Sequence, residues 1–367
     1  MLIRAAVVEG QDGPFTLQEL RLEGPKAGEV LVKVAACGVC HTDFAARAGF
    51  METPFPMVLG HEGSGVVLEA GPDSAFRPGQ RVGFSYGWCG KCPACLEGQP
   101  YGCEENRALN FSGRAYDGGH RLYWGEREVS TFFGQSAFAE YAVVHENNLY
   151  PVPDDLPLKL AAPLGCGIQT GSGAVLNYLR PRAGSSLVVA GCGIVGLSAV
   201  MAAVSAGCGS IICVDKNPAR LETAKALGAT HTLQPEGISL PRAVRDILGG
   251  RGADYAIDCT GSGQSVRASL GSIRSLGVCV VLGATGEVSF HCEQELMGPG
   301  RTLAGLVEGC SVPREFLPRL LELWRQGKFP FDRLLEFYPF AEISRAAEDS
   351  LSGRVLKAVL LMDETLK

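Results

Sequence analysis

Several features that mark other protein classes are missing from this 367-residue sequence. It contains no polybasic run, no low-complexity tract and no internal repeat. Its 33 basic residues are outnumbered by 39 acidic ones, which gives a formal net charge of -6 and an isoelectric point near 5.6. This balance gives no electrostatic reason to expect a nucleic-acid partner. The opening residues, MLIRAAVVEG, lack the apolar length and the cleavage site of a signal peptide. We therefore expect a cytoplasmic protein with reduced thiols.

Long hydrophobic runs are also scarce, and the main candidate is broken by glycine. Residues 187–214 carry no charge over 28 positions, a length that would cross a bilayer. Five glycines interrupt this segment, and its apolar residues group as a strand, a helix and a second strand. A fully buried βαβ unit is apolar throughout for that reason. We therefore expect no membrane association.

The pattern of strand-like and helix-like segments changes twice along the sequence, which predicts two domains. The first third alternates strand-like runs with Gly/Pro turns, as a mostly antiparallel β-domain does. The middle alternates strands and helices, which predicts a parallel doubly wound sheet of the Rossmann type. The last part returns to a helix (PREFLPRLLELWRQGK), a strand-like FYPF and a final strand, VLKAVLLM. We predict an α/β protein with a Rossmann domain at 168–307 inserted in a mostly β catalytic domain at 1–167 and 308–367.

Within the insert, four runs have the composition of buried strands: SLVVAG, IICVD, ADYAIDC and CVVLGA. The stretches between them have a helical pattern: VGLSAVMAAVSA, PARLETAKALG, PRAVRDILGG and SVRASLGSIRSLG. Between the first strand and the first helix lies GCGIVG, a G-x-G-x-x-G motif formed by Gly191, Gly193 and Gly196. Asp215 ends the second strand 19 residues after Gly196, as a dinucleotide-binding fingerprint requires.

Each residue of this fingerprint has a physical role. Gly191 allows the tight turn, Gly193 lets the backbone approach a pyrophosphate, and Gly196 permits close packing of the helix, whose N-terminus attracts phosphate. Asp215 would accept hydrogen bonds from the adenosine ribose hydroxyls. Its charge would repel a 2′-phosphate, so we expect NAD in preference to NADP. The remaining cofactor-contact predictions are Ile194 and Val195 in the motif, Lys216 beside Asp215, and Gly283 at the end of CVVLGA.

A second motif, WCGKCPACLEGQPYGCE, places four cysteines in a C-x2-C-x2-C-x7-C array. Four thiolates in one short loop are typical of a closed, tetrahedral structural zinc site. An iron–sulfur cluster is the serious alternative, because bacterial ferredoxins use a similar C-x2-C-x2-C spacing. The fourth cysteine here follows seven residues later, no proline follows it, and no second cysteine cluster is evident. We therefore predict zinc at Cys89, Cys92, Cys95 and Cys103.

A third set of residues is dispersed. CGVCHTD at residues 37–43 matches C-x-x-C-H, which is compatible with c-type haem attachment, a dithiol redox centre or a partial metal site. His61 and Glu62 lie in LGHEGSG, and Cys166 lies in PLGCGIQTG. Spacing alone does not bring these residues together.

Taken together, the motifs resemble the zinc-dependent medium-chain alcohol dehydrogenases, nearly end to end. The matching segments are CGVCHTD, PMVLGHEGSGVV, the four-cysteine loop, PLGCGIQTGSGAVLN, GCGIVGLSAV and LGATH. The finer similarity is to the bacterial aryl-alcohol (benzyl alcohol) dehydrogenase branch, in FFGQSAFAEYAV, PLGCGIQTG, QGKFPFDRLLEFYPF and EISRAAEDS. The resemblance implies a GroES-like fold for the β-domain, a second and catalytic zinc in each chain, NAD as cofactor, and a homodimer or homotetramer.

Carried over residue by residue, the resemblance makes Cys40, His61 and Cys166 the protein ligands of the catalytic zinc. It places Asp43 behind His61, where it would hold the ligating tautomer. Glu62 would lie behind the metal and assist ligand exchange. Thr42 would contact the substrate hydroxyl and begin the route of its proton.

The resemblance also places three residues at the cofactor and identifies two departures. Thr170 would lie near the nicotinamide, and Lys357 near the pyrophosphate. His41 stands where many members have an arginine that pairs with the pyrophosphate, so we expect weaker binding and quicker release of NADH. Ala45 stands where many members have a relay histidine, so the hydroxyl proton would leave through Thr42 and a cofactor ribose hydroxyl. Of the C-x-x-C-H letters, we therefore expect only Cys40 to bind metal, with Cys37 a packed thiol.

The activity that these residues imply is reversible, NAD-dependent oxidation of primary alcohols to aldehydes. Zinc lowers the pKa of a bound hydroxyl, and hydride can leave the carbon once the oxygen bears negative charge. Aromatic or allylic alcohols of the benzyl type are the expected substrates. Terpene alcohols such as geraniol and S-hydroxymethylglutathione are alternatives. Cys166 argues against polyol dehydrogenases, which often have glutamate there, and a zinc-stabilised NAD sensor without turnover is the non-enzymatic alternative.

Overall fold

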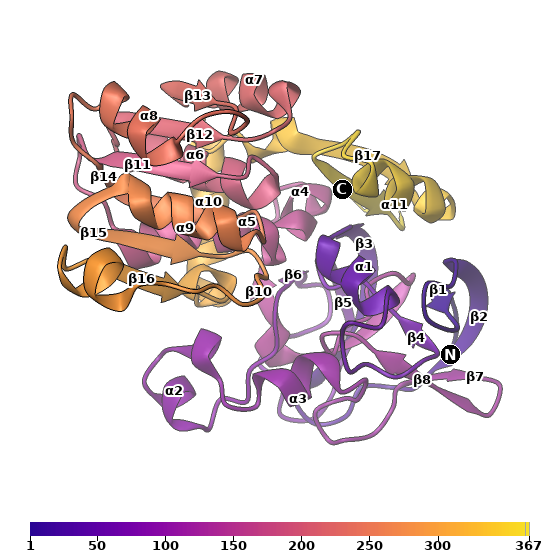
Figure 1. Cartoon of the computed structure of the whole chain (residues 1–367). Coiled ribbons are helices and arrows are strands. Elements are labelled where there is room, and N and C mark those ends of the chain that lie inside the picture. The colour runs from indigo at the N-terminus through magenta and orange to yellow at the C-terminus, as the bar shows by residue number, and fades with distance from the viewer. Residues whose placement is uncertain (364, 367) are drawn as a thin grey trace. The chain divides into compact units, whose positions relative to one another are not determined.

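The β-rich part of the molecule is built from both ends of the chain. The computed structural model describes residues 1–363, 365 and 366. It divides into unit 1, formed by Met1–Cys166, Val312–Leu321 and the chain from Asp332 onward, and unit 2, formed by Gly167–Ser311 and Glu322–Phe331. Figure 1 shows the indigo start and the yellow end of the chain contributing to one sheet system, with the insert in pink and orange.

Unit 1 contains a small closed barrel and a larger sheet. The barrel has the strand order β1-β2-β7-β8-β4. The larger sheet has the order β10-β6-β5-β3-β18-β17, with β9 also paired to β3. The barrel strands are β1 Leu2–Val8, β2 Thr16–Leu22, β4 Met57–Val58, β7 Leu122–Trp124 and β8 Arg127–Thr131. The sheet strands are β3 Glu29–Gly38, β5 Gly63–Ala70, β6 Arg81–Phe84, β9 Tyr141–His145, β10 Leu149–Pro151, β17 Leu335–Pro339 and β18 Lys357–Leu361.

Strand β3 is the centre of the larger sheet. Its sequence, EVLVKVAACG, is rich in β-branched residues, and nine of its ten positions are buried because strands flank it on both sides. β18 pairs antiparallel with the end of β3, with Leu360 opposite Cys37. The expectation that the chain returns to complete its first domain is met by this pairing. The helices of unit 1 are α1 His41–Arg47, α2 Pro93–Leu96, α3 Asn106–Phe111, α4 Leu158–Ala161 and α11 Ile343–Leu351. Helix α10, Pro313–Arg325, belongs to unit 1 up to Leu321 and to unit 2 from Glu322.

Unit 2 is a doubly wound sheet of six parallel strands in the order β13-β12-β11-β14-β15-β16. The strands are β11 Ser186–Ala190, β12 Ser210–Val214, β13 His231–Leu233, β14 Ala253–Asp258, β15 Ile273–Val281 and β16 Thr302–Gly305. The helices are α5 Gly167–Gly173, α6 Ile194–Ser205, α7 Pro218–Ala226, α8 Leu240–Ile247 and α9 Gly263–Ser272. The predicted Rossmann-type sheet is confirmed.

Helices cover both faces of this sheet, which explains why its strands are apolar on both sides. Val188 and Ile212 pack with Leu240 of α8 and Leu270 of α9, the two helices at the near face in Figure 1. On the opposite face α6 lies so close that a Cβ added at Gly196 would approach Val189 to 3.2 Å. The uncharged segment 187–214 is the βαβ unit β11-α6-β12, and among the described residues no helix is long and apolar enough to span a membrane.

One predicted helix is shorter than the sequence pattern indicated. SVRASLGSIRSLG reads as one helix, but α9 ends at Ser272 and β15 begins at Ile273. Ile273 pairs with Ala253 on β14, and the guanidinium of Arg274 donates to Asp254 at 2.7 Å. Leu276 has a φ of 61°, which a helix does not allow. Sheet pairing and an ion pair therefore override a pattern that is compatible with a helix.

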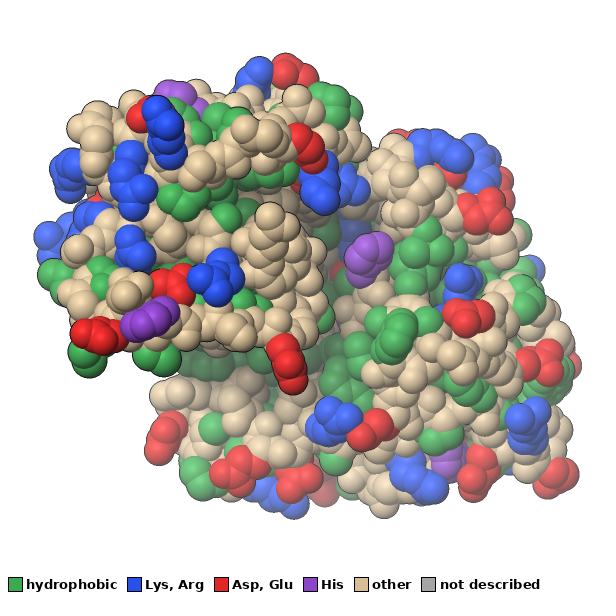
Figure 2. All heavy atoms as spheres, viewed as in Figure 1, with side chains coloured by type: hydrophobic (Ala, Val, Ile, Leu, Met, Phe, Trp, Pro, Cys, Tyr) green, Lys and Arg blue, Asp and Glu red, His purple; other side chains and the backbone are tan. Residues whose placement is uncertain are grey.

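The division of the chain also differs in detail from the predicted one. Residues 308–311 and 322–331 belong to unit 2, although the sequence places the whole of 308–367 in the catalytic domain. Side-chain hydrogen bonds explain this: Gln169 donates to Glu308 at 2.7 Å, and Ser205 donates to the carbonyl oxygen of Lys328 at 2.8 Å. On the face shown in Figure 2, acidic and basic side chains are interspersed over both units.

A buried ion pair links the barrel to the sheet within unit 1. The Arg121 guanidinium, 2% exposed, donates to both carboxylate oxygens of Glu29 at 2.9 and 2.8 Å. It also pairs with Asp117 at 3.0 Å. Glu29 begins β3, and Arg121 immediately precedes β7.

We expect Arg121→Met to lower the free energy of unfolding of unit 1 by roughly 3 kcal/mol, because Glu29 would stay buried without its cation. Urea unfolding followed through Trp88 and Trp124, both in unit 1, measures this change. Arg4→Met is the control, since its ion pair with Glu140 is 53% exposed on the arginine side and its loss should cost less than about 0.5 kcal/mol. Equal losses in the two variants would contradict the expectation.

Candidate active site and zinc sites

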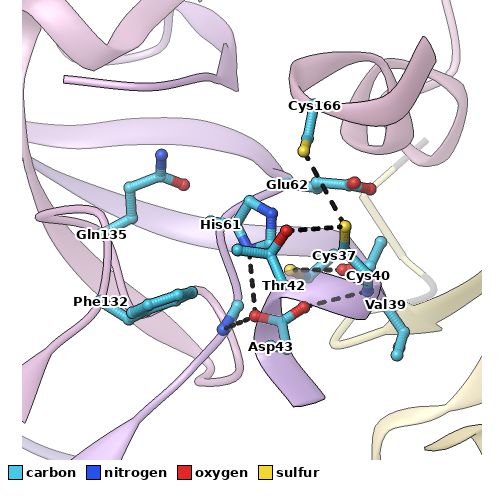
Figure 3. A network of polar contacts seen from close by, with 12 residues as sticks. Cys37, Val39, Cys40, Thr42, Asp43, His61, Glu62, Phe132, Gln135 and Cys166 are labelled. Atoms are coloured by element: carbon cyan, nitrogen blue, oxygen red, sulfur yellow. Dashed lines mark hydrogen bonds and ion pairs between the residues drawn. The ribbon is translucent and has the colours of Figure 1, made fainter. Parts of the chain in front are cut away.

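The stretch CGVCHTD spans the end of β3 and the start of α1. Cys37 lies on β3, is fully buried, and its thiol contacts the carbonyl oxygen of Gly38 at 3.4 Å. Burial raises the pKa of the Cys37 thiol well above its usual range, so it remains a packed thiol. Cys40 is the N-cap of α1, and the helix places Thr42 and Asp43 in its first turn. Figure 3 shows Cys40 and Thr42 lying beside one another, and the Thr42 hydroxyl is 3.6 Å from the Cys40 sulfur.

The buried carboxylate of Asp43 organises the residues around it. One oxygen accepts a hydrogen bond from the backbone N–H of Cys40 at 3.0 Å. The other accepts from the backbone N–H of Gly60 at 3.0 Å and lies 3.0 Å from His61 Nδ1. A carboxylate at this position keeps the proton of His61 on Nδ1 and leaves Nε2 as a ligand atom. Asp43 therefore lies where the prediction placed it, behind the imidazole.

Four candidate metal-binding side chains converge in unit 1: Cys40, His61, Glu62 and Cys166. Their ligand atoms all lie within 4.8 Å of one another, and the sulfurs of Cys40 and Cys166 are 3.9 Å apart. Two thiolates bound to one tetrahedral zinc at Zn–S distances of ~2.3 Å would be separated by roughly 3.8 Å. His61 Nε2 is buried, and among the described residues it has no hydrogen-bond partner. The donor set and its spacing therefore fit a Cys2His zinc centre.

The protonation preference of the Cys40 thiol favours metal binding, whereas Asp43 and Cys40 outweigh burial and raise the pKa of His61 well above its usual range, so a metal would have to displace a proton from its imidazole. The neighbouring Cys166 thiol, together with His61, holds the pKa of the Cys40 thiol well below its usual range. Thiolates and neutral imidazoles are the forms that bind metal. Burial raises the pKa of Glu62 to about 7, against the opposing effect of the Lys357 ammonium group. Figure 3 shows Glu62 between Cys166 and Cys40 in this view.

Lys357 is buried beside the metal-binding cluster of unit 1. The expectation was a contact with the cofactor pyrophosphate, but the side chain is 2% exposed. Its ammonium group donates to the carbonyl oxygen of Val39 at 3.0 Å and forms an ion pair with Glu62. The carboxylate of Glu62 raises the pKa of Lys357 further, so the lysine remains charged despite its burial. It adds a buried positive charge next to the Cys40–His61 cluster, and its expected contact with the pyrophosphate stays a prediction.

The residue that packs against the imidazole, Phe133, could not be predicted from the sequence motifs. The ring of Phe133 stacks on His61 with centroids 4.5 Å apart and planes 21° apart, and Phe132 meets the same ring edge-on at 5.5 Å. Phe133 has a φ of 53°, a backbone conformation that a bulky residue rarely adopts. The pair of phenylalanines followed by a glycine in FFG is the only trace of this arrangement in the sequence.

The four cysteines of the second motif form a separate cluster in unit 1: Cys89, Cys92, Cys95 and Cys103. Their sulfurs lie within 4.8 Å of one another, with 3.9 Å between Cys89 and Cys95. The backbone N–H groups of Cys92 and Cys89 point at the sulfurs of Cys89 and Cys103, both at 3.3 Å, as they would at thiolates. This spacing fits one tetrahedral zinc, whereas a cluster that binds each cysteine through a different iron would spread the sulfurs farther apart.

The Gly-rich loop of unit 2 has the geometry that dinucleotide binding requires. Gly191 turns with a φ of 90°, and a Cβ at Gly196 would lie 1.8 Å from the carbonyl oxygen of Gly191. A Cβ at Gly193 would meet nothing within 4 Å, so the backbone is open to a ligand there. Gly193 is also the N-cap of α6, where Ile194, Val195 and Gly196 form the first turn. The N–H groups of this turn suit a pyrophosphate.

The remaining predicted cofactor residues lie in unit 2. Asp215 and Lys216 follow β12, and Gly283 follows β15, so all three are at the carboxyl edge of the sheet. One carboxylate oxygen of Asp215 accepts from the N–H of Cys192 in the Gly-rich loop at 2.7 Å. Thr170 lies on α5, and His41 in unit 1 is exposed at the start of α1. Their roles toward a cofactor stay predictions.

A doubly wound dinucleotide-type sheet, a β-rich unit with a Cys2His cluster and a four-cysteine cluster together define a zinc-dependent dehydrogenase. Residues 26–154 match the alcohol dehydrogenase GroES-like domain, and residues 195–324 match the zinc-binding dehydrogenase domain. The chain belongs to the zinc-type medium-chain alcohol dehydrogenase family. It is therefore an alcohol dehydrogenase with zinc and NAD as its cofactors, and the predicted GroES-like and Rossmann-type domains are confirmed.

Individual relatives agree with this assignment over nearly the whole chain. A geraniol dehydrogenase from Castellaniella defragrans is 40% identical over 98% of this chain and 97% of its own length. The crystal structure of a benzyl alcohol dehydrogenase from Acinetobacter calcoaceticus matches with a TM-score of 0.95 and 42% identity, covering 99% of this chain and 100% of that one. An alcohol dehydrogenase zinc-binding domain protein from Burkholderia ambifaria matches with a TM-score of 0.96 and 44% identity, with the same coverage.

We expect Asp43→Asn to weaken zinc binding at the Cys40–His61–Cys166 cluster by about 10- to 100-fold, because an amide cannot accept all three hydrogen bonds of the carboxylate. Competition with a chromogenic chelator measures the affinity of each of the two sites. Asp154→Asn, at an exposed position, is the matched control. An affinity equal to that of the control would show that the carboxylate does not support the metal site.

For the four-cysteine cluster, Cys103→Ser should reduce the metal content from two zinc ions per chain to one. It should also lower the thermal midpoint of unit 1, since a structural zinc contributes directly to folding. Metal analysis together with calorimetry tests both outcomes. Cys292→Ser, at an exposed position in unit 2, should keep both ions and the midpoint of the wild type. Two zinc ions in Cys103→Ser, or an iron–sulfur absorption in the wild type, would exclude this assignment.

Proposed function

We propose that this chain catalyses the reversible, NAD-dependent oxidation of primary alcohols to aldehydes, with aromatic and allylic alcohols of the benzyl type preferred. The observation that carries the proposal is the cluster of Cys40, His61 and Cys166. Its thiols are 3.9 Å apart, and the buried Nε2 of His61 has no hydrogen-bond partner among the described residues. These donors would hold the catalytic zinc and leave a fourth position open to the alcohol oxygen.

Zinc held by these residues would supply Lewis-acid chemistry, lowering the pKa of an alcohol hydroxyl toward neutrality. The chain must then move a proton and hold the substrate. The Thr42 hydroxyl, 3.6 Å from the Cys40 sulfur, is placed to accept the proton of the alcohol and to pass it outward. Ala45 offers no further relay on α1, so the next acceptor would be a cofactor ribose hydroxyl or water. Asp43 keeps His61 in its ligating tautomer throughout.

Unit 2 would hold the cofactor that accepts the hydride. The open backbone at Gly193 and the N-terminus of α6 would bind the pyrophosphate, and Asp215 would accept hydrogen bonds from the adenosine ribose. His41 would approach the pyrophosphate with a weaker charge than an arginine. Orientation of the carbinol hydrogen against the nicotinamide is the remaining requirement, because hydride transfer depends on close approach of the two carbons.

Aromatic side chains near His61 support the substrate preference. Phe111 packs edge-on against Phe133 at 5.2 Å, and Phe133 in turn stacks on the imidazole. One side of the cluster in unit 1 is therefore apolar and aromatic, which suits an alcohol carried by a planar, unsaturated group. Relatives named for benzyl alcohol and for geraniol, at 42% and 40% identity, agree with this chemistry.

Two other substrates remain as alternatives within the same activity. Geraniol shares the allylic alcohol and the apolar body of the preferred class. S-hydroxymethylglutathione carries free carboxylates that require a cation. The Lys357 ammonium group does not supply one, because it is buried and paired with Glu62.

We expect the chain to form a homodimer or a homotetramer, as the resemblance implies. Analytical sedimentation measures this oligomeric state.

The test of the proposal is NADH formation by the zinc-loaded chain on benzyl alcohol, geraniol, hexanol, ethanol and S-hydroxymethylglutathione. We expect kcat/KM for benzyl alcohol to exceed that for ethanol by about 100-fold or more, since burying several CH2-sized groups contributes ~0.8 kcal/mol each. Cys166→Ala should lose turnover and one zinc ion. An absence of NADH formation from every alcohol would contradict the activity, and a higher value for ethanol or for the glutathione adduct would contradict the preference.

We expect Asp215→Asn to raise kcat/KM with NADP by roughly 10- to 100-fold, because the substitution removes a negative charge that faces the 2′-phosphate position. Asparagine keeps an oxygen that can accept the hydrogen bond from Cys192. Steady-state kinetics with NAD and NADP at constant ionic strength measure the ratio. Asp246→Asn, at an exposed position on α8, should leave the ratio unchanged. A wild-type chain that uses both cofactors equally would show that Asp215 does not select between them.

A further inference from the structure

Directly after its last strand, unit 2 contains a strained segment. Glu308, Gly309 and Cys310 have φ angles of 50°, 61° and 50°, so three successive residues adopt the left-handed region. Residues other than glycine keep this conformation only where contacts with neighbouring residues enforce it. Such residues cluster at ligand sites. The segment follows β16, so it lies at the carboxyl edge of the parallel sheet, where doubly wound folds bind their ligands.

Helix α5 holds this segment in place. A Cβ added at Gly309 would come within 2.5 Å of the carbonyl oxygen of Gln169 and 2.6 Å of that of Thr170. A Cβ at Gly173 would come within 2.3 Å of the carbonyl oxygen of Gly309. The two backbones are therefore in direct contact. Asn177 adds a hydrogen bond from its side chain to the carbonyl oxygen of Gly309 at 3.3 Å.

Glu308 makes the polar connection between the segment and α5. One carboxylate oxygen accepts from the side-chain N–H of Gln169 at 2.7 Å and from the hydroxyl of Thr170 at 3.4 Å. Gln169 is fully buried, so its bond to Glu308 is shielded from water. A threonine hydroxyl has one proton, and here it is directed at Glu308. The oxygen of Thr170 is therefore left to act as an acceptor toward a ligand.

The position of Glu308 relative to the order of the strands indicates which half of a dinucleotide it would serve. In a doubly wound dinucleotide domain, the two halves of the sheet bind the two mononucleotide halves. The Gly-rich loop and Asp215 belong to the half formed by β11, β12 and β13. The other half, β14, β15 and β16, leads to the segment that contains Glu308 and would therefore face the second nucleotide.

We propose that Glu308 is a positioning residue for the nicotinamide half of the cofactor. By fixing Gln169 and the Thr170 hydroxyl before the cofactor binds, it leaves the Thr170 oxygen in place as an acceptor for the carboxamide N–H of nicotinamide. The inference rests on the proposed function, which requires a nicotinamide dinucleotide in unit 2. It predicts that loss of Glu308 affects binding of the nicotinamide half and spares the adenosine half.

Two ligands separate these halves in an experiment on the full-length, zinc-loaded chain. NADH, followed by its fluorescence, reports both halves, and ADP-ribose, followed by calorimetry, contains the adenosine half without nicotinamide. We expect Glu308→Ala to weaken NADH binding by about tenfold or more, the size expected for lost hydrogen bonds to a charged group. ADP-ribose binding should stay within about twofold of the wild type. Glu308→Gln should restore NADH binding, because its amide oxygen can accept both hydrogen bonds.

Glu236→Gln, at an exposed position in unit 2, is the matched control and should change neither affinity. Equal affinities for NADH in Glu308→Ala and the wild type would overturn the inference. Parallel losses for NADH and ADP-ribose would overturn it as well, since they would indicate a general structural role. If Glu308→Ala fails to fold, Gln169→Met removes the 2.7 Å hydrogen bond to Glu308 instead. Unchanged NADH binding in that variant would also contradict the inference. A wild-type chain that binds neither ligand would refute the proposed function itself.

Discussion

The carboxylate of Asp43 is the constraint on which the geometry of the metal centre depends. It has no solvent exposure, and it receives three groups from two separate segments of unit 1: the N–H of Cys40, the N–H of Gly60 and Nδ1 of His61. The same anion therefore sets the direction of one thiol ligand and the tautomer of the imidazole ligand. A buried charge held only by hydrogen bonds is costly unless each bond is made, so the loop and the helix cannot shift independently.

Charge in this region is balanced by neighbours that are distant in sequence. Asp43 and the Cys40 thiolate place negative charge in this region, and Lys357 provides the buried cation that faces Glu62, whose pKa burial raises to about 7. Zinc bound by two thiolates and a neutral imidazole would add no net charge. The positive charge of Lys357 therefore balances the charge of the Glu62 carboxylate next to the metal site, and the metal is not needed for this. This arrangement explains why a lysine is tolerated at a fully buried position.

The sequence was informative where function depends on contiguous residues. The Gly-rich loop, the βαβ pattern and the four-cysteine array each lie in one short segment, and spacing predicted their fold or chemistry. Cys40, His61 and Cys166 could be joined only through a family resemblance, because tertiary pairing brings them together. Three features left no usable pattern. Phe133 stacks on His61 through an unusual backbone conformation, Lys357 reaches Glu62 across the sheet, and the end of α9 is set by pairing of Ile273 with β14.

The pairing of β18 with β3 has a consequence for the order in which the chain folds. β3 is synthesised near residue 38 and its partner near residue 359, so all of unit 2 emerges between them. Unit 2 has contacts of its own and can fold as it leaves the ribosome, because domains generally fold as units. The strand that carries Cys37 and leads to Cys40 must meanwhile keep an unpaired edge. The Cys40 thiol is thus made early, while the strand that leads to it gains its last partner only when the final strand is made.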